Sequence, residues 1–314
     1  MTTRTWVGSS SNNASDPTAW TPNGAPAAGD TLDMNSGTMN VSGTDLAGDI
    51  VDLEGNGSSA MFNLSGATSN FSVALQGYGQ TAQIDLLNLT DWVGGFSTDP
   101  QGNVTVSGPG ARWTNTATSI NGSAKINTTV DGNGTIHVDE AHSSGVVEFM
   151  AGVGSGQTVS ISGYATYGGE HGVVQVDQPA VYQAYTDLRF GELHLKGLQA
   201  DSYQQNGDTL TLYEQGNVVD TLKLGLTTVN DAVPQNFGVS QTTDGVVIHA
   251  DGTYYTGGGT ALRVYAAPPS PTPPTPVPAP TPPPNPTPTP TPPPSPQPPA
   301  PRRLSRQPRQ TRPW

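Results

Sequence analysis

The densest group of potential metal ligands is the run His137-Val-Asp139-Glu140-Ala-His142. Imidazole and carboxylate groups are the usual protein ligands of zinc, together with thiolates. On an extended strand, His137 and Asp139 lie on one face and Glu140 and His142 on the other, because side chains alternate. This alternation splits a four-ligand site in two. We therefore interpret the run as outward polar residues and predict no metal site.

Two glycine turns contain an acidic residue, Asp131-Gly-Asn-Gly134 and Asp244-Gly245. The nonapeptide G-G-x-G-x-D-x-U-x, whose repeats bind calcium in β-rolls, does not occur in the sequence. We therefore expect no cofactor and keep calcium only as a weak alternative.

Tyr164, Tyr167, Tyr182 and Tyr185 form the densest aromatic cluster, together with Phe190. Aromatic rings offer a large, rigid stacking surface, and the tyrosine hydroxyl adds a polar group. We take the four tyrosines as candidate carbohydrate-binding residues. The alternative is that these rings close the last coil of the fold against a cap. We assign no catalytic residue, because the sequence contains no Gly-x-Ser-x-Gly elbow, phosphate-binding loop or dinucleotide fingerprint.

The scaffold that holds these side chains is poor in apolar and charged residues. Hydrophobic residues are 33% and charged residues 12% of the 314, and the absence of cysteine excludes disulfides and cysteine nucleophiles. Residues 1–266 contain all 25 acidic residues but only 7 of the 12 basic ones, which gives them a net charge of −18. Such an acidic body repels nucleic acids and anionic membrane surfaces. No apolar run reaches the ~18 residues of a membrane span.

Residues 267–314 differ sharply from the rest of the chain in composition. They hold 23 of the 30 prolines, five arginines and no acidic residue. A proline-rich chain lacks the backbone donors and apolar bulk of a core, so we predict a disordered linker or an extended polyproline-II spacer. We expect residues 1–266 to fold without this tail.

The body consists of short runs in which apolar and polar residues alternate, as in half-buried strands. Five apolar markers, Met39, Val51, Phe62, Val73 and Ile84, follow one another at nearly equal intervals. The phrase apolar-x-apolar-Ser-Gly returns at residues 39–43, 62–66, 104–108 and 159–163. Self-similarity at a short period indicates a repeat architecture.

A parallel β-solenoid and an antiparallel sandwich both produce this pattern. The solenoid is favoured because each coil buries only a thin apolar stripe, whereas a sandwich of this size needs more large apolar residues. From Thr186 the chain becomes leucine-rich, and Asn206-Gly207 and Gln215-Gly-Asn217 indicate hairpin turns. We predict an all-β chain made of an N-terminal cap (1–34), a solenoid (35–185), a C-terminal antiparallel β cap or small β domain (186–266) and the disordered tail (267–314).

One stretch resembles a known family. Residues 104–115 read Val104-Thr-Val-Ser-Gly-Pro-Gly-Ala-Arg-Trp-Thr-Asn115, and Gly132-Asn-Gly-Thr-Ile-His-Val138 follows. They resemble the V-x-V-x-G-x-G-S-x-W-x-N repeat and the G-x-G-T-L-T-I strand of bacterial autotransporter passenger domains and related surface β-helix proteins. Trp6-Val-Gly, Trp20 and Gly29-Asp30 are similar to the opening of such proteins. The resemblance implies a right-handed parallel β-helix.

The function that this resemblance implies is a non-enzymatic secreted or cell-surface β-solenoid, which acts as an adhesin, a matrix component or a spacer. Its expected partner is a surface polysaccharide or a host or matrix component. The N-terminus lacks the apolar region of a signal peptide, and no strand pattern of a membrane barrel follows Tyr265. We therefore expect leaderless export or an incomplete gene product.

The alternative function is a carbohydrate-active β-helix enzyme or a carbohydrate-binding module. Polysaccharide lyases share the right-handed β-helix, and that family implies a basic residue grouped with acidic calcium ligands on one wall. Arg112 and Lys125 are the basic candidates here. An enzyme is expected to show a groove that holds one of them within side-chain reach of at least two acids.

Overall fold

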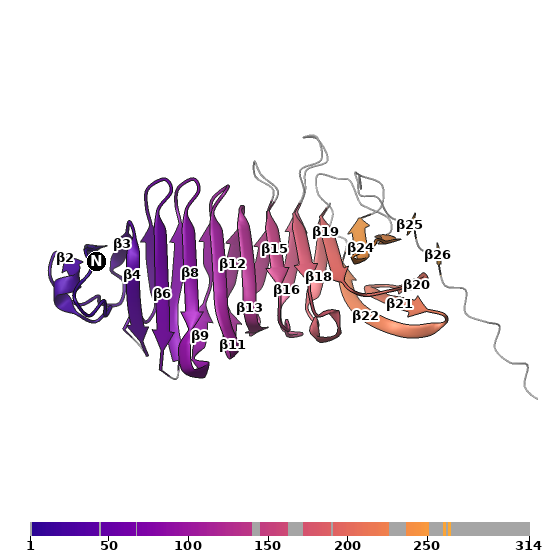
Figure 1. The fold of residues 1–314 in the computed structure, drawn as a ribbon, viewed down its shortest axis with the longest axis horizontal. Helices are drawn as coiled ribbons and strands as arrows, with labels where there is room; N and C mark the ends of the chain where they lie inside the picture. Colours follow the sequence, from indigo (N-terminus) through magenta and orange to yellow (C-terminus); the bar gives the residue numbers. More distant parts are fainter. Residues whose placement is uncertain are drawn as a thin grey trace, which may run out of the picture. The chain divides into compact units, whose positions relative to one another are not determined.

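The computed structural model of the chain describes residues 2–43, 45–66, 68–139, 145–162, 172–189, 191–225, 237–250, 260–261 and 263–264. The chain divides into two units, residues 1–267 and 268–314, and all described residues belong to the first. These residues form an all-β structure with a parallel β-solenoid of about seven turns and antiparallel strands at its end (Figure 1). The predicted fold class is thereby confirmed, while the predicted tail lies outside the described residues.

The first side of the solenoid, called wall A here, is a parallel sheet with one strand per coil. Its strands pair in the order β1 (Thr3–Trp6), β3 (Thr31–Met34), β5 (Asp49–Leu53), β7 (Thr68–Leu75), β10 (Phe96–Thr98), β12 (Ala117–Ile120), β14 (Thr135–Val138), β16 (Thr158–Ser162) and β18 (Tyr185–Arg189). Every second residue is buried, as Leu32, Val51 and Ile136 are, which gives each strand one inward and one outward face.

The second side, called wall B, is built in the same way. Its strands pair in the order β4 (Gly37–Ser42), β6 (Ser59–Ser65), β8 (Thr81–Leu86), β11 (Asn103–Asn115), β13 (Ser123–Asp131), β15 (Val146–Phe149), β17 (Val173–Val176) and β19 (Glu192–Lys196). A short third side joins the start of β7, β9 (Asp91–Gly94) and the ends of β11 and β13. The solenoid interior lies between these three sides.

The regular interval between the five apolar markers follows from this arrangement. Met39, Phe62 and Ile84 are register partners on wall B, whereas Val51 and Val73 are partners on wall A. A full coil in this region extends from Phe62 to its register partner Ile84, and Val73 lies at its midpoint. Successive markers therefore lie on alternate walls, and the interval between them is half a coil.

Aromatic rings fill the middle of the solenoid. The ring of Trp113 stacks on Trp92 at a centroid distance of 5.3 Å and on Phe96 at 5.4 Å. The indole N–H of Trp92 donates to the carbonyl of Phe71 at 2.9 Å, and that of Trp113 donates to Gly94 at 3.0 Å. Both buried indoles thus satisfy their one donor while they pack, which is the usual condition for burying tryptophan.

The stretch from Val104 to Asn115 that resembles the surface β-helix repeat forms most of β11. Val104 and Val106 point inward on wall B, and Trp113 and Asn115 point inward on the third side. Two glycines make the corner between them. A Cβ on Gly108 would lie 2.6 Å from Cβ of Leu86, and Gly110 has a φ of +80°. The motif therefore specifies a corner and the strand that follows it.

The N-terminal residues cover the first edges of both walls. β2 (Trp20–Thr21), which follows the 3-10 turn η1 (Pro17–Ala19), pairs antiparallel with β1. A bridge between Asn13 and Asn40 protects part of β4. Because unpaired strand edges promote aggregation, these contacts act as a cap. β1 and β3, which fall within the predicted cap of residues 1–34, are themselves strands of wall A.

At the other end the parallel walls continue into antiparallel strands. β18 pairs in parallel with β22 (Asn217–Gly225), which joins β21 (Thr209–Glu214) and β20 (Ser202–Asn206) in an antiparallel meander, while β26 (Arg263–Val264) lies parallel beside β20. On wall B, β19 is followed by β24 (Gly245–Ala250), β23 (Phe237–Gln241) and β25 (Thr260–Ala261). The expected boundary at residues 185 and 186 falls inside β18, because β18 and β19 are still strands of the parallel walls.

The two hairpin turns lie where the sequence predicts them. Gly207 and Asp208 connect β20 to β21, and Gln215 and Gly216 connect β21 to β22 with φ values of +51° and +81°. Besides η1, the described part of the chain has two 3-10 turns, η2 (Leu87–Leu89) and η3 (Pro179–Val181). None of the helices among these residues has the length and apolar character to cross a membrane.

One lateral contact on wall A opposes stability. Asp33 and Asp52 are register partners on β3 and β5. Burial raises the pKa of Asp52, and the negative charge of Asp33 adds to this, although a hydrogen bond from Gln76 acts in the opposite direction. A carboxyl group with a raised pKa destabilises the folded state when it is ionised, and this cost disappears as the pH falls through the folded-state pKa.

We expect Asp52→Asn to raise the free energy of unfolding at pH 7 by about 0.2–1 kcal/mol, the usual range for lateral pairs. The gain is expected to vanish in acid, where the wild-type carboxyl is protonated. Urea denaturation at both pH values measures this difference. Asp33→Asn removes the same repulsion, so the double variant should gain less than the sum of the single variants. Strict additivity would show that the two carboxylates do not interact.

Candidate functional site

Tyr182 does not form a stacking surface for a ligand. Its side chain is only 3% exposed, its ring lies 6.1 Å from that of Phe149, and its hydroxyl is 2.7 Å from Oγ1 of Thr186. Burial raises the pKa of this phenol. The ring faces inward because Tyr182 pairs with Val153 on the third side of the coil. The proposed role of Tyr182 in carbohydrate stacking is therefore wrong, and the ring fills the interior instead.

Tyr185 lies on the outer face of β18 and is 37% exposed. Burial, followed by the charges of Asp187 and Asp208, raises the pKa of its phenol. Its hydroxyl lies directly over Gly225, where a Cβ would be 1.9 Å away. Tyr182 thus points into the interior from the third side, whereas Tyr185 points outward from wall A. Tyr164, Tyr167 and Phe190 lie outside the described residues.

The possible metal ligands do not form a cluster in the described part of the chain. His137 is exposed on the outer face of wall A, Asp139 follows β14, and Glu140 and His142 lie outside the described residues. Among the residues that the structure describes, no three His, Asp or Glu side chains gather as a metal ion requires. The acid of one glycine turn, Asp131, is instead paired with Arg112 at 3.1 Å.

The outer face of wall B carries a row of charged and amide side chains, which we call the charged ladder. Lys125 lies 3.1 Å from Glu148, and Lys196 lies 3.9 Å from Glu148 and 3.3 Å from Asp177. The amide of Gln175 donates to Glu148 at 3.1 Å and to Asp177 at 3.0 Å. The ladder spans β13, β15, β17 and β19, and its opposite charges compensate one another across the coils.

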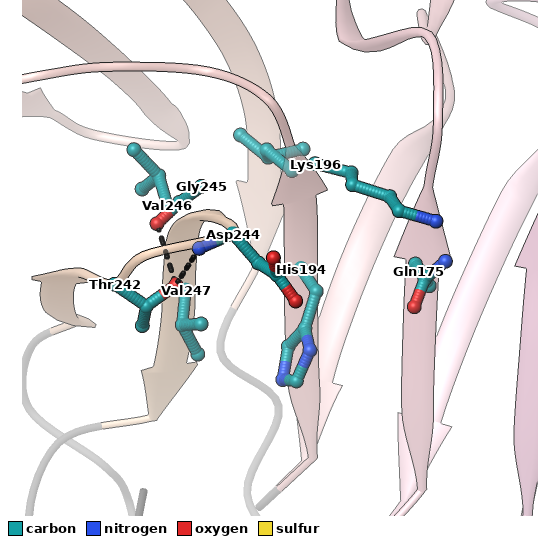
Figure 2. Close-up of a pocket in the computed structure, with 9 residues that line it drawn as sticks. Gln175, His194, Lys196, Thr242, Asp244, Gly245, Val246 and Val247 are labelled. Carbon is teal, nitrogen blue, oxygen red and sulfur yellow. Dashed lines mark hydrogen bonds between the residues drawn. The ribbon is translucent and has the colours of Figure 1, made fainter. Parts of the chain in front are cut away.

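A small pocket lies where the ladder meets the antiparallel strands. Gln175, His194, Lys196, Thr242 and Asp244 contribute to its lining. Figure 2 shows Thr242 and Asp244 at the turn that precedes β24, with His194 and Lys196 on β19 and Gln175 on β17 beside it. Nε2 of His194 is 2.7 Å from Oε2 of Glu192. The cavity measures about 50 Å³. This volume holds a few water molecules and is too small for a sugar ring.

The basic residues of the body are held in ion pairs. This applies to all six whose side chains the structure describes, since Arg263 has no described side chain. Besides those of the charged ladder and Arg112, the pairs are Arg4–Asp30 at 2.7 Å, Arg189–Asp187 at 2.8 Å and Lys223–Asp208 at 3.4 Å. Arg112 lies on the third side and Lys125 on wall B. The structure thus places the two candidate bases on different sides of the solenoid.

Each of the two long walls has a shallow groove. The groove on wall A, of about 520 Å³, extends from Ile50 to His137 across small residues such as Ser97 and Ser119. The wall-B groove, of about 390 Å³, crosses β4, β6, β8 and β11. Its polar lining residues are Thr38, Ser59, Thr81, Gln83, Asn103 and Thr105.

The wall-B groove is not apparent from the amino-acid sequence. Its signal in the sequence is the set of polar residues that alternate with buried apolar ones, for example Thr81 and Gln83 around buried Ala82. This alternation marks an outward face but does not show which strands become neighbours. Comparisons of the chain with protein-family models, with curated proteins and with solved structures found no match.

Proposed function

We propose that this protein is a non-enzymatic β-solenoid of the cell surface or the extracellular space, which acts as an adhesin, a matrix component or a spacer. The observation that carries this proposal is the pairing of charges on the walls: all six basic side chains in the described structure are bound to carboxylates. A lysine or arginine held this way has its charged group against a carboxylate of the protein and is not free to contact a substrate. The parallel walls and their N-terminal cap support a mechanical role, since every coil is bonded to its neighbours.

The resemblance of β11 to the repeats of surface β-helix proteins supports the location. Residues Gly108, Gly110, Trp113 and Asn115 all have a structural use in this coil, which is what a repeat motif requires. The acidic body adds to this, because a net charge far from zero keeps an exposed protein soluble.

Fractionation of the native cells tests this proposal. We expect the protein in the surface or secreted fraction and expect added protease to digest it on intact cells. A protein found only in the cytoplasm would overturn the proposed location. In the same preparation, no release of reducing ends from polysaccharides is expected. Cleavage that is lost in Arg112→Ala would overturn the non-enzymatic assignment.

The second candidate function is a carbohydrate-active β-helix enzyme or a carbohydrate-binding module. The enzyme lacks support from the geometry, because in the described structure Arg112 is paired with one acid, Asp131, and Lys125 with one acid, Glu148, whereas an enzyme is expected to hold one base beside at least two acids. The binding module is favoured by one specific observation, the uncharged wall-B groove. Binding without catalysis is also compatible with an adhesin.

A further inference from the structure

We propose that the wall-B groove binds an uncharged polysaccharide chain that runs along the solenoid axis. This inference deepens the proposed adhesive function and rests on it. It assigns a ligand class and a site to the outer face of β4, β6, β8 and β11. The occupant is a polymer of neutral sugars, which the charge, hydrogen-bonding capacity and strand register of the groove favour.

The groove is uncharged although the chain is strongly acidic. Its lining contains hydroxyl, amide and small apolar side chains, and Met61 is the largest apolar residue among them. The thioether of methionine adapts to irregular apolar surfaces such as the C–H face of a sugar ring. At the C-terminal end of the groove, Thr105 is the register partner of Lys125, where the charged ladder begins. A second boundary lies on β8, where the amide of Gln83 donates to the carboxylate of Asp85, which is not part of the lining. The neutral surface is thus the lining between Asp85 and Lys125.

Several polar groups of the groove have no hydrogen-bond partner among the residues that the structure describes. The hydroxyls of Thr38, Ser59, Thr81 and Thr105 make no hydrogen bond to any residue that the structure describes. The side-chain amide of Asn103, in contrast, has partners within the protein: its N–H donates to the carbonyl of Gln101, and its oxygen accepts from the hydroxyl of Ser123. The four hydroxyls can both donate and accept, which matches the hydroxyl groups that a neutral sugar presents around its ring.

The polar groups repeat once per coil. Ser59, Thr81 and Asn103 are register partners on β6, β8 and β11. The hydroxyls of Ser59 and Thr81 are unbonded among the described residues, whereas the amide of Asn103 keeps one N–H beside its bonds to Gln101 and Ser123. Neighbouring strands lie ~4.8 Å apart, so these groups form a row with that spacing along the axis. A polymer of identical units of comparable length can bond to successive coils in the same way. A row of this kind favours a chain over a single small sugar, because the contacts of linked units add.

An extended peptide fits this surface less well than a glycan. Peptides usually bind sheets at a free edge, where backbone groups are unpaired. The groove lies on the face of wall B, and β4, β6, β8 and β11 are paired with one another. The occupant therefore has to bond to side chains alone. Polyuronates are disfavoured as well, because the net charge of −18 repels them.

The test is native affinity electrophoresis of the full chain in gels that contain hydroxyethylcellulose, mannan or a β-1,3-glucan, with polygalacturonate as the charged polymer. The test variant Ser59→Ala/Thr81→Val/Thr105→Val removes three hydroxyls with little change in volume. The matched control, Ser72→Ala/Ser97→Ala/Ser119→Ala, removes three hydroxyls from wall A. Thermal unfolding of all three proteins checks that the variants fold.

We expect at least one neutral polymer to retard the wild type and the wall-A control equally. The wall-B variant should bind at least about tenfold more weakly, as the loss of several hydrogen bonds predicts. The inference is overturned if no neutral polymer retards the wild type, if the wall-B variant binds as well as the wild type, or if polygalacturonate alone is bound. Any of these results with a surface-located protein refutes the groove and leaves the proposed function intact. A cytoplasmic protein refutes the function itself.

Discussion

Replacing Trp113 by alanine is expected to lower the free energy of unfolding by about 3–5 kcal/mol, the range for removal of a large buried aromatic side chain. Trp113 is fully buried and stacks on both Trp92 and Phe96. Its removal leaves a cavity between two coils, because strands bonded above and below cannot collapse into the space. Urea denaturation followed by circular dichroism measures the loss.

Tyr78→Ala is the matched control for the Trp113 variant. This aromatic residue is 61% exposed, and substitutions at exposed sites usually change stability by less than about 0.5 kcal/mol. A Trp113→Ala variant as stable as the control would show that the aromatic stack is not part of the core. Loss of signal only around Trp92 and Trp113, without global unfolding, would show that coils unfold independently.

Asn115→Leu is expected to cost about 1–3 kcal/mol for each buried polar group that it leaves without a partner. The Nδ2 of Asn115 donates to Oε1 of Gln157 at 2.8 Å, and its Oδ1 accepts from Oγ1 of Thr118 at 2.8 Å. All three side chains are buried. Leucine has a similar volume, so the loss comes from the hydrogen bonds rather than from a cavity. Thermal and urea unfolding measure it.

The pair Asn115→Leu and Gln157→Leu separates this network from general packing effects. Gln157 also donates to the carbonyl of Asp131 at 2.6 Å, so its own replacement has a cost. Because the two amides share one bond, the double variant should lose less than the sum of the single losses. A loss in the double variant that equals or exceeds the sum of the two single losses would show that the two side chains act independently.

The sequence predicts most strands of the solenoid because inward and outward residues differ in polarity. Met39, Phe62 and Ile84 mark wall B, and Val51 and Val73 mark wall A. Alternation does not reveal which neighbour each strand takes, so the regular interval alone does not show that two walls alternate. The resemblance of residues 104–115 to a surface β-helix repeat predicts that this stretch forms part of a β-helix coil. The structure explains the motif: Gly108 and Gly110 form a corner, and Trp113 and Asn115 are buried after it.

The boundary after the solenoid and the candidate site are harder to predict. Leu188 and Leu193 lie on parallel strands of the solenoid, although in sequence they resemble the leucines of the cap. Because parallel and antiparallel strands require the same alternation of apolar and polar residues, the sequence does not distinguish the two. The amphipathic ring of Tyr182 suggests a ligand contact, whereas its inward direction depends on a pairing with a distant residue. The wall-B groove combines residues from four strands, which local spacing cannot bring together.

The half-coil interval also limits how such a chain can change length. Inserting a segment as long as one coil after a strand returns the next strand to its own wall, so the flanking residues keep their neighbours. Inserting a segment half as long transfers every later strand to the opposite wall. Between residues 93 and 112 such an insertion separates Trp92 from Trp113, and between residues 116 and 156 it separates Asn115 from Gln157. We therefore expect duplication of a whole coil to preserve the contacts between neighbouring coils and duplication of half a coil to break them.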